Sequence, residues 1–287
     1  MFATVNNEED KNSLQGDIDK LMNWSDTWLL KFNKSKCKHM HLGPEKDYNY
    51  MMEENMIANT MEEKDLGIII DNKLNFQNHI NKQVNKANQK LGLINRSFKY
   101  MDKDMFLQLF KSLVRPHLEY GSTVWSVANK KEAIIIENVQ RRATRLIKEI
   151  QHLSYGNRLK HLGLPTLQYR RIRADVVETF KIIKGMDKVE IDTIFPKNNT
   201  ATTRGHKYKI YKKHCRTNRR KYSFSQRVVA HWNALPESVI DATSVNSFKN
   251  RLNNHWKNIE IKFVPDFYGP EAGISRNDNV MDLRGQS

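Results

Sequence analysis

Apolar residues recur every three or four positions over most of the chain after residue 76, and this spacing constrains the fold more than any other feature. It matches the 3.6-residue turn of an α-helix, so each stripe predicts one amphipathic helix. The first stripe consists of Ile80, Val84, Ala87, Leu91, Ile94 and Phe98. Further stripes predict helices over 103–114, 130–150, 167–184, 223–233 and 245–256. We therefore expect a mostly helical chain.

Polar residues, a glycine and a proline mark the expected ends of these helices. Asp102 and Ser244 are positioned to cap the helices that follow them. The helix after Asp102 should stop before Pro116, because the residue before a proline is pushed out of the helical region. Gly185 should end the helix that starts at residue 167.

Residues 1–75 show a different pattern, a helix followed by short strands. The helix is expected over 13–31, with a stripe of Leu14, Ile18, Leu21, Ser25 and Trp28 that Trp24 and Leu29 widen. Alternating residues predict a half-buried strand over 38–42, and 48–52 suits another. The β-branched run over 66–70 predicts a buried strand. We expect this part to be α+β and too small for a comfortable independent domain.

Charge is distributed unevenly along the chain, which carries a net charge of +16. Residues 1–75 hold 9 Lys/Arg against 14 Asp/Glu, whereas residues 129–260 hold 28 against 11. Residues 76–128 hold 8 against 3. A field this one-sided attracts polyanions, of which nucleic acid is the first candidate and an anionic membrane the weaker one.

Composition places the chain inside the cell. Two cysteines do not make a disulfide framework, and no apolar run approaches the roughly 20 residues that span a bilayer. The first ten residues lack the basic and apolar regions of a signal peptide. We expect a nuclear or cytoplasmic protein that is neither secreted nor transmembrane.

Five segments, in the same order along the chain, resemble the reverse transcriptase of non-LTR retrotransposons of the LINE, jockey-like or CR1-like kind. They are LLKFNKSKC at 29–37, EKDLGIIID at 63–71, SLVRPHLEYG at 112–121, NVQRRATRLI at 138–147 and SFSQRVVAHWNALP at 223–236. The resemblance implies a palm remnant over 1–75, a helical thumb over 76–128 and a basic helical C-terminal domain over 129–260. Residues 261–287 are expected to form a disordered tail.

The resemblance also assigns roles to individual residues. Lys36 matches the palm lysine, a general acid in the family, although a solvated turn lysine explains it better in a chain without metal ligands. Leu66 and Gly67 match the Leu-Gly strand of the primer grip, or are an ordinary buried strand.

The adjacent aspartates that bind the catalytic Mg²⁺ ions in the family have no counterpart, since no Asp-Asp pair occurs in the sequence. The chain is expected to begin just after that pair. We expect no metal or other cofactor and no polymerase activity from the chain alone. The palm and fingers portion that the family has and this chain lacks is then a candidate partner.

Three groups of basic residues are candidate contacts to RNA or DNA. The first, Arg141, Arg142, Arg145 and Lys148, should lie on one helix, and the second is Arg170, Arg171 and Arg173. The third, interleaved with tyrosines that can stack on bases, is Lys207, Tyr208, Tyr211, Lys212, Lys213, Arg216, Arg219, Arg220 and Lys221. Alternatives are a solvated helix face for the first two groups, and a disordered loop or nuclear-localisation patch for the third.

Other chemistries find less support. Cys37, His39 and His41 lie close together, but a structural zinc site normally needs four ligands with paired short spacings, so we expect no metal site. Two alternatives to nucleic-acid binding stay open: a non-enzymatic helical scaffold, and a chain without selected function.

Overall fold

The computed structural model describes residues 1–43, 48–125, 130–195, 206–257, 259 and 262–264. The described chain is mostly helical, as the sequence predicted, and the strands are short. It forms two compact units, Met1–Phe76 (unit 1) and Gln77–Ser287 (unit 2). The predicted parts 76–128 and 129–260 therefore belong to one unit. Of the predicted tail, only 262–264 is described.

Unit 1 begins with helix α1, Glu8–Thr27. It starts earlier than predicted because the side chain of Asn7 accepts a hydrogen bond from the Asp10 amide at 2.8 Å and caps the helix. Ser25 is buried, as the stripe predicted, but Trp24 and Trp28 are 47% and 65% exposed. The prediction that these tryptophans belong to the apolar face is wrong, because the packing face turns toward Met22 instead.

The strands of unit 1 form three separate pairs. Strands β1 (Lys38–His39) and β4 (Ala58–Asn59) are parallel; antiparallel pairs are β2 (Met51–Met52) with β3 (Asn55–Met56), and β5 (Glu62–Asp65) with β6 (Ile68–Asp71). A 3-10 turn covers Lys34–Lys36. Met22, Tyr50, Met52 and Ile57 form a small core against α1.

Leu66 and Gly67 form the two-residue turn between β5 and β6, not the start of a buried strand as predicted. Both have positive φ, 44° for Leu66 and 86° for Gly67, the conformation that two-residue hairpins require. Leu66 is 83% exposed. The buried residues of the run are therefore Ile68 and Ile69, and β6 pairs with β5.

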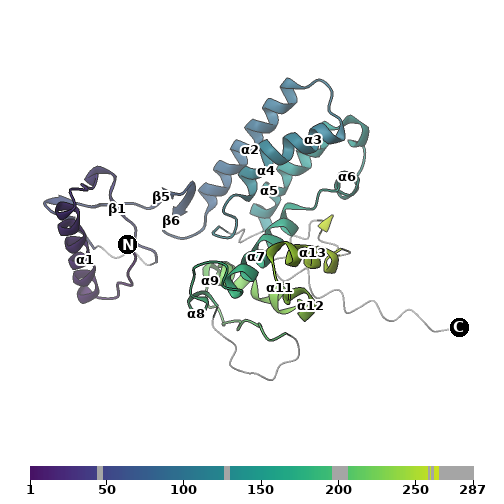
Figure 1. The fold of residues 1–287 in the computed structure, drawn as a ribbon. Coiled ribbons are helices and arrows are strands. Elements are labelled where there is room, and N and C mark those ends of the chain that lie inside the picture. The colour runs from purple at the N-terminus through teal and green to yellow at the C-terminus, as the bar shows by residue number, and fades with distance from the viewer. Residues whose placement is uncertain (44–47, 126–129, 196–205, 258, 260–261, 265–287) are drawn as a thin grey trace. The chain divides into compact units, whose positions relative to one another are not determined.

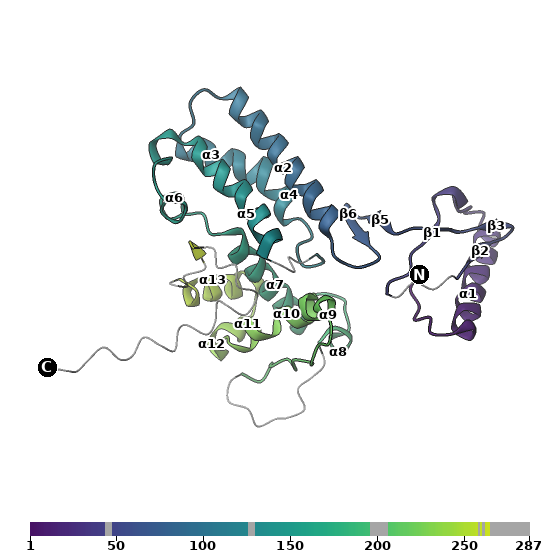
Figure 2. The ribbon, with the colours of Figure 1, turned by 180° about the vertical axis from the view of Figure 1, so that it is seen from behind.

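Unit 2 consists of helices (Figures 1 and 2). They are α2 (Gln77–Ser97), α3 (Lys103–Leu109), α4 (Arg115–Glu119), α5 (Lys130–Ala143), α6 (Tyr155–Leu162), α7 (Leu167–Ile183), α8 (Ile191–Ile194), α9 (Asn218–Tyr222), α10 (Phe224–Arg227), α11 (Val229–Asn233), α12 (Glu237–Ile240) and α13 (Val245–His255). Helix α7 contacts α4 and α5 on one side and α11 and α13 on the other. Helix α7 thereby joins the group that contains α4 and α5 to the group that contains α11 and α13.

The predicted stripes form the core of unit 2. Ile80, Val84, Ala87, Leu91 and Ile94 are buried on α2, although Phe98 is 39% exposed beyond the helix end. Phe180 of α7 stacks on Phe248 of α13 with ring centroids 4.1 Å apart. The side chain of Ser244 caps α13 and that of Asp102 caps α3, as predicted.

The helix after Asp102 does not stop before Pro116 as predicted. A π-helical turn over Phe110–Val114 continues α3 into α4, and the amide of Arg115 donates to the carbonyl of Phe110. Pro116 then lies in the first turn of α4, directly after the π-helical turn.

The predicted helix over 130–150 is also interrupted. Helix α5 ends at Ala143, and two 3-10 turns follow, Thr144–Leu146 and Lys148–Ile150. Ile147 and Ile150 are buried there, at 1% and 4% exposure. This change of period decides where the basic residues of the segment point.

Candidate nucleic-acid interface

The first basic group does not share one helix face, because α5 ends inside it. Arg141 packs over the ring of Tyr155, 5.1 Å from its centroid, and is only partly exposed. Arg142 is exposed, and its Nη2 donates to Asn88 Oδ1 of α2 at 2.8 Å. Arg145 and Lys148 are exposed on the 3-10 turns. Three of the four cations thus face solvent.

The second basic group is engaged in the interior contacts of α7. Arg170 forms a two-point ion pair with Glu119, and Arg173 donates to Asn253 Oδ1 at 2.9 Å. Arg171 donates to the carbonyl of Leu118 at 2.8 Å and stacks on Trp125, 3.9 Å from the ring centroid. Burial, followed by the charge of Arg227, lowers the pKa of Arg171 to about 10. These three arginines hold helices together, and we leave them out of the proposed interface.

The third basic group lies on the segment that leads into α9 and on α9 itself. Its exposed members are Lys207, Tyr211, Lys212, Lys213, Arg216, Arg219, Arg220 and Lys221. No acidic residue occurs between 206 and 222. The side chain of Thr217 caps α9, which places Arg219, Arg220 and Lys221 in one short helical turn. The segment therefore exposes seven cations with no acidic residue between them in the sequence.

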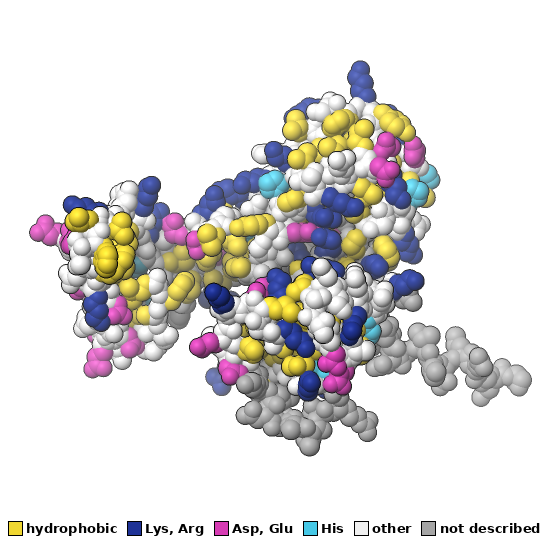
Figure 3. Space-filling view, viewed as in Figure 1, with side chains coloured by type: hydrophobic (Ala, Val, Ile, Leu, Met, Phe, Trp, Pro, Cys, Tyr) yellow, Lys and Arg dark blue, Asp and Glu magenta, His cyan; other side chains and the backbone are white. Residues whose placement is uncertain are grey.

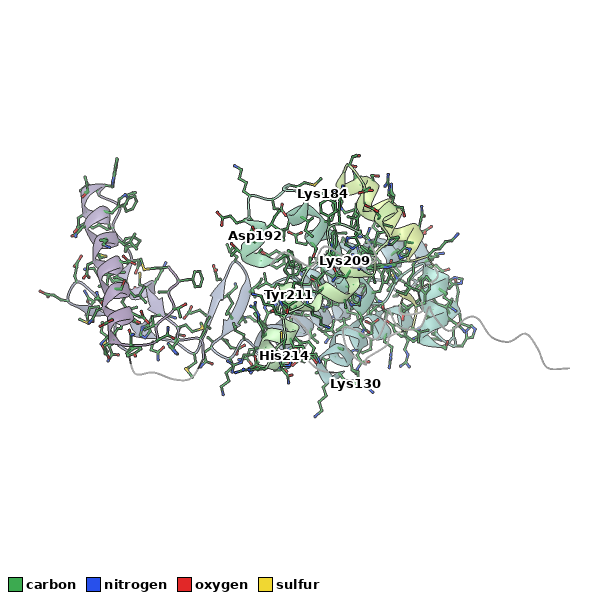
Figure 4. The ribbon with its side chains drawn as sticks, turned by 90° about the horizontal axis from the view of Figure 1, so that it is seen from below. Lys130, Lys184, Asp192, Lys209, Tyr211 and His214 are labelled. Atoms are coloured by element: carbon green, nitrogen blue, oxygen red, sulfur yellow. The ribbon has the colours of Figure 1, made fainter. Side chains whose placement is uncertain are left out.

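The two candidate stacking tyrosines differ in accessibility. Tyr211 is 50% exposed and follows Lys209 along an extended segment that continues to His214 (Figure 4). The ring of Tyr208 is instead covered by the Lys184 ammonium group, 4.5 Å from its centroid. Of these two tyrosines, Tyr211 is therefore the more accessible to an unpaired base.

Helix α2 carries a lysine row that the sequence analysis missed. Lys82, Lys86 and Lys90 recur every four residues, all are exposed, and the helix contains no acidic residue. Lys86 and Lys90 lie close to His117 of α4, whose pKa is lowered by burial and then by these two charges. Figure 3 shows Lys and Arg side chains along α2. The regular spacing of lysines on an acid-free helix was a signal available in the sequence.

A buried polar network lies next to Arg141. Glu137 accepts hydrogen bonds from the Tyr155 hydroxyl at 2.5 Å and from the Leu167 amide at 3.0 Å. Gln140 donates to the Tyr155 hydroxyl at 3.2 Å. Burial raises the pKa of Glu137 to about 7, and it also raises the pKa of Tyr155. The network joins α5, α6 and α7 below the basic surface.

The candidate residues of unit 1 have no catalytic surroundings within the described part of the chain. Lys36 is exposed at the end of a 3-10 turn. His39 contacts the carbonyl of Ile57 at 3.0 Å and packs edge-on against Tyr50. Over the described residues, no three His, Cys, Asp or Glu side chains converge as metal ligands would.

None of the described helices combines the length and apolar character that crossing a membrane requires.

Comparisons with known proteins relate about half of the chain to a polymerase. The chain is 25% identical over 148 residues to the RNA-directed DNA polymerase from mobile element jockey of Drosophila funebris, a match to 48% of this chain and 16% of that protein. An uncharacterized protein of Caenorhabditis elegans is 28% identical over 140 residues, covering 48% of this chain and 70% of its own length. No family model and no solved structure matches. Part of the chain is thus similar to part of a retrotransposon polymerase.

Proposed function

We propose that this chain binds single-stranded RNA or DNA through unit 2 and is related by descent to a retrotransposon reverse transcriptase. The proposal rests on one observation: some cations of unit 2 are used in contacts within the fold, and others are exposed. Buried and half-buried arginines are used inside the fold, whereas the lysine row of α2 and the cations of 207–221 other than Lys209 are exposed. Exposed cations on segments whose sequence contains no acidic residue are available to phosphates.

The proposed interface has three parts. The lysine row, Lys82, Lys86 and Lys90, is joined to α5 by the hydrogen bond between Arg142 and Asn88. Arg145 and Lys148 continue the basic surface beyond the end of α5. The exposed cations of 207–221 neutralise phosphates, and Tyr211 accepts a base of any identity on its open face. We expect little sequence preference, because neither phosphates nor ring faces distinguish bases.

The similarity to the jockey polymerase supports the reverse transcriptase relationship. The five resembling segments are in keeping with it. They include Lys36, which matches the palm lysine, and Leu66-Gly67, which match the primer-grip pair but form a turn here. Polymerisation itself is not proposed, since the sequence has no adjacent aspartates to hold two metal ions. The remaining palm and fingers, supplied by another polypeptide, are the proposed protein partner, and the nucleus or cytoplasm is the proposed compartment.

Two assays on the purified chain test this proposal. Fluorescence anisotropy with a labelled single-stranded oligonucleotide should show saturable binding at low ionic strength. A primer–template with Mg²⁺ and all four nucleotides should show no primer extension. Absence of binding would leave the scaffold interpretation, and template-dependent extension would require metal ligands outside those identified.

A further inference from the structure

A hollow in unit 2 lies between the end of α5 and the start of α6, apart from the lysine row and the 207–221 segment. It encloses roughly 400 Å³. Its lining consists of Arg141, Ser154, Tyr155, Gly156, Asn157, Lys160 and Val264. Two of these side chains are cations and none is a carboxylate. The hollow therefore has the charge of an anion site.

Arg141 has hydrogen-bonding capacity that the described protein does not use. Its Nε is buried and has no hydrogen-bond partner among the described residues. The neighbouring Arg158 differs, since its Nε donates to Thr144 Oγ1 at 3.0 Å and its Nη1 to the Leu153 carbonyl at 2.7 Å. The ring of Tyr155 fixes the direction of the Arg141 guanidinium. A guanidinium that lies over a ring on the wall of a hollow without carboxylates suits an oxyanion.

The first turn of α6 adds donors to the same hollow. The side chain of Ser154 accepts from the Asn157 amide, which leaves the amides of Tyr155 and Gly156 without an intrahelical acceptor. Gly156 also lets the chain at Phe263 approach closely, because a Cβ at this position would lie 3.2 Å from the Phe263 carbonyl oxygen. Lys160, exposed one turn further along α6, supplies the second charge.

We propose that this hollow binds one phosphoryl group between Arg141, Lys160 and the first turn of α6. This inference rests on the proposed function in one respect: the phosphoryl group is expected to belong to a nucleic-acid strand bound on the basic surface. A free phosphate ion offers the same chemistry, and the experiment separates the two sources.

Equilibrium dialysis of the full chain against labelled orthophosphate at low ionic strength tests the site. Wild type should bind about one phosphate per chain. Lys160→Ala should weaken this binding about tenfold, the loss expected for one charged hydrogen bond, and Lys160→Arg should restore it. Lys111→Ala, an exposed cation outside both the lining and the proposed interface, is the matched control and should bind like wild type. Equal affinity of wild type and Lys160→Ala, or no saturable binding, would overturn the proposal.

A competition experiment distinguishes a nucleic-acid phosphate from a free phosphate ion. A single-stranded oligonucleotide should displace the phosphate from wild type, since the strand places its own phosphate in the hollow. Retention of phosphate under a saturating oligonucleotide would overturn the nucleic-acid source and leave a free-phosphate site. Phosphate binding in a chain that binds no oligonucleotide would refute the proposed function and not this site.

Discussion

Arg227 and Asp175 form a two-point ion pair inside unit 2, with Nε–Oδ2 at 2.8 Å and Nη2–Oδ1 at 2.9 Å. Their side chains are only 8% and 9% exposed. The same guanidinium donates to the carbonyls of Ser122 and Thr123. The pair therefore ties α10 to α7 and to the segment after α4, three parts of the chain more than 50 residues apart.

Removal of one partner of this pair should destabilise unit 2. Arg227→Met leaves the Asp175 carboxylate buried without its counter-charge, and the expected loss is about 3–5 kcal/mol in the free energy of unfolding. Urea denaturation followed by circular dichroism measures it. The double variant Arg227→Met, Asp175→Leu should recover part of the loss, because it no longer buries the Asp175 carboxylate without its ion-pair partner, while Arg171 keeps its buried charge.

As a surface control, Lys20→Ala removes an ion pair with Asp17 whose side chains are 80% and 50% exposed. Its unfolding curve should match wild type. Equal effects of Lys20→Ala and Arg227→Met would contradict the structural role of the buried pair.

Glu137 should make stability fall as pH rises. Its pKa is raised to about 7 in the folded chain from an ordinary 4.5, so the folded state holds the proton more tightly than the unfolded state. The contribution is fully present below about pH 4.5 and is lost by about pH 7, in total roughly 3 kcal/mol. Denaturation of wild type and Glu137→Gln across this range measures it, because the amide keeps the shape and cannot ionise.

The free energy of unfolding of wild type must be compared with that of Glu137→Gln at each pH, because His79 changes stability with pH in the opposite direction. Burial, followed by Arg171, lowers the pKa of His79 to about 4, so its contribution is lost as the pH falls below 6.5. A wild-type curve that stays parallel to that of Glu137→Gln from pH 4.5 to 7 would refute the role of Glu137.

The lysine row of α2 should contribute to nucleic-acid affinity through charge alone. Replacing Lys82, Lys86 and Lys90 by Ala should weaken binding to a single strand and reduce the salt slope by about two units, if each lysine neutralises one phosphate. The matched control replaces Lys111 and Lys257, exposed lysines of unit 2 outside the proposed interface, by Ala and should leave the slope nearly unchanged. An unchanged slope for the alanine variant would remove α2 from the interface.

Tyr211 and Tyr208 should differ in their effect on binding. Tyr211→Ala should cost about 1–3 kcal/mol of binding free energy if one base stacks on the ring, and leave the salt slope nearly unchanged. Tyr208→Ala should have little effect on affinity, since Lys184 already covers that ring. Tyr211→Phe keeps the ring and should bind like wild type; equal losses for Tyr208→Ala and Tyr211→Ala would contradict the assignment.

The helices that the sequence predicted best are those whose core contacts repeat without interruption. The α2 stripe from Ile80 to Ile94 and the α13 pair Phe248 and Leu252 keep a helical period, so local spacing was enough. The end of α5 was missed because the buried Ile147 follows a 3-10 turn, and no cap or breaker marks Ala143. Leu66 was missed because the Ile68–Ile70 run concealed a turn in which leucine takes an unusual φ.

The sequence indicates which segments are basic, but it does not indicate which of their cations are exposed. Basic clusters are visible in the sequence, but whether a cation faces solvent depends on partners far along the chain. Arg170 meets Glu119 51 residues away, and Arg227 meets Asp175 52 residues away. No local pattern encodes such pairings, so Arg170, Arg171 and Arg173 looked like the exposed cations of 207–221.

The central claim is that the basic surface of unit 2 binds single-stranded nucleic acid through phosphates. Its most direct test is the affinity of the full chain for a labelled single strand, measured by anisotropy over a series of salt concentrations. If about six phosphates are contacted, log affinity should fall against log salt with a slope of roughly −4. An affinity that does not change with salt, or no binding at low ionic strength, would contradict the account.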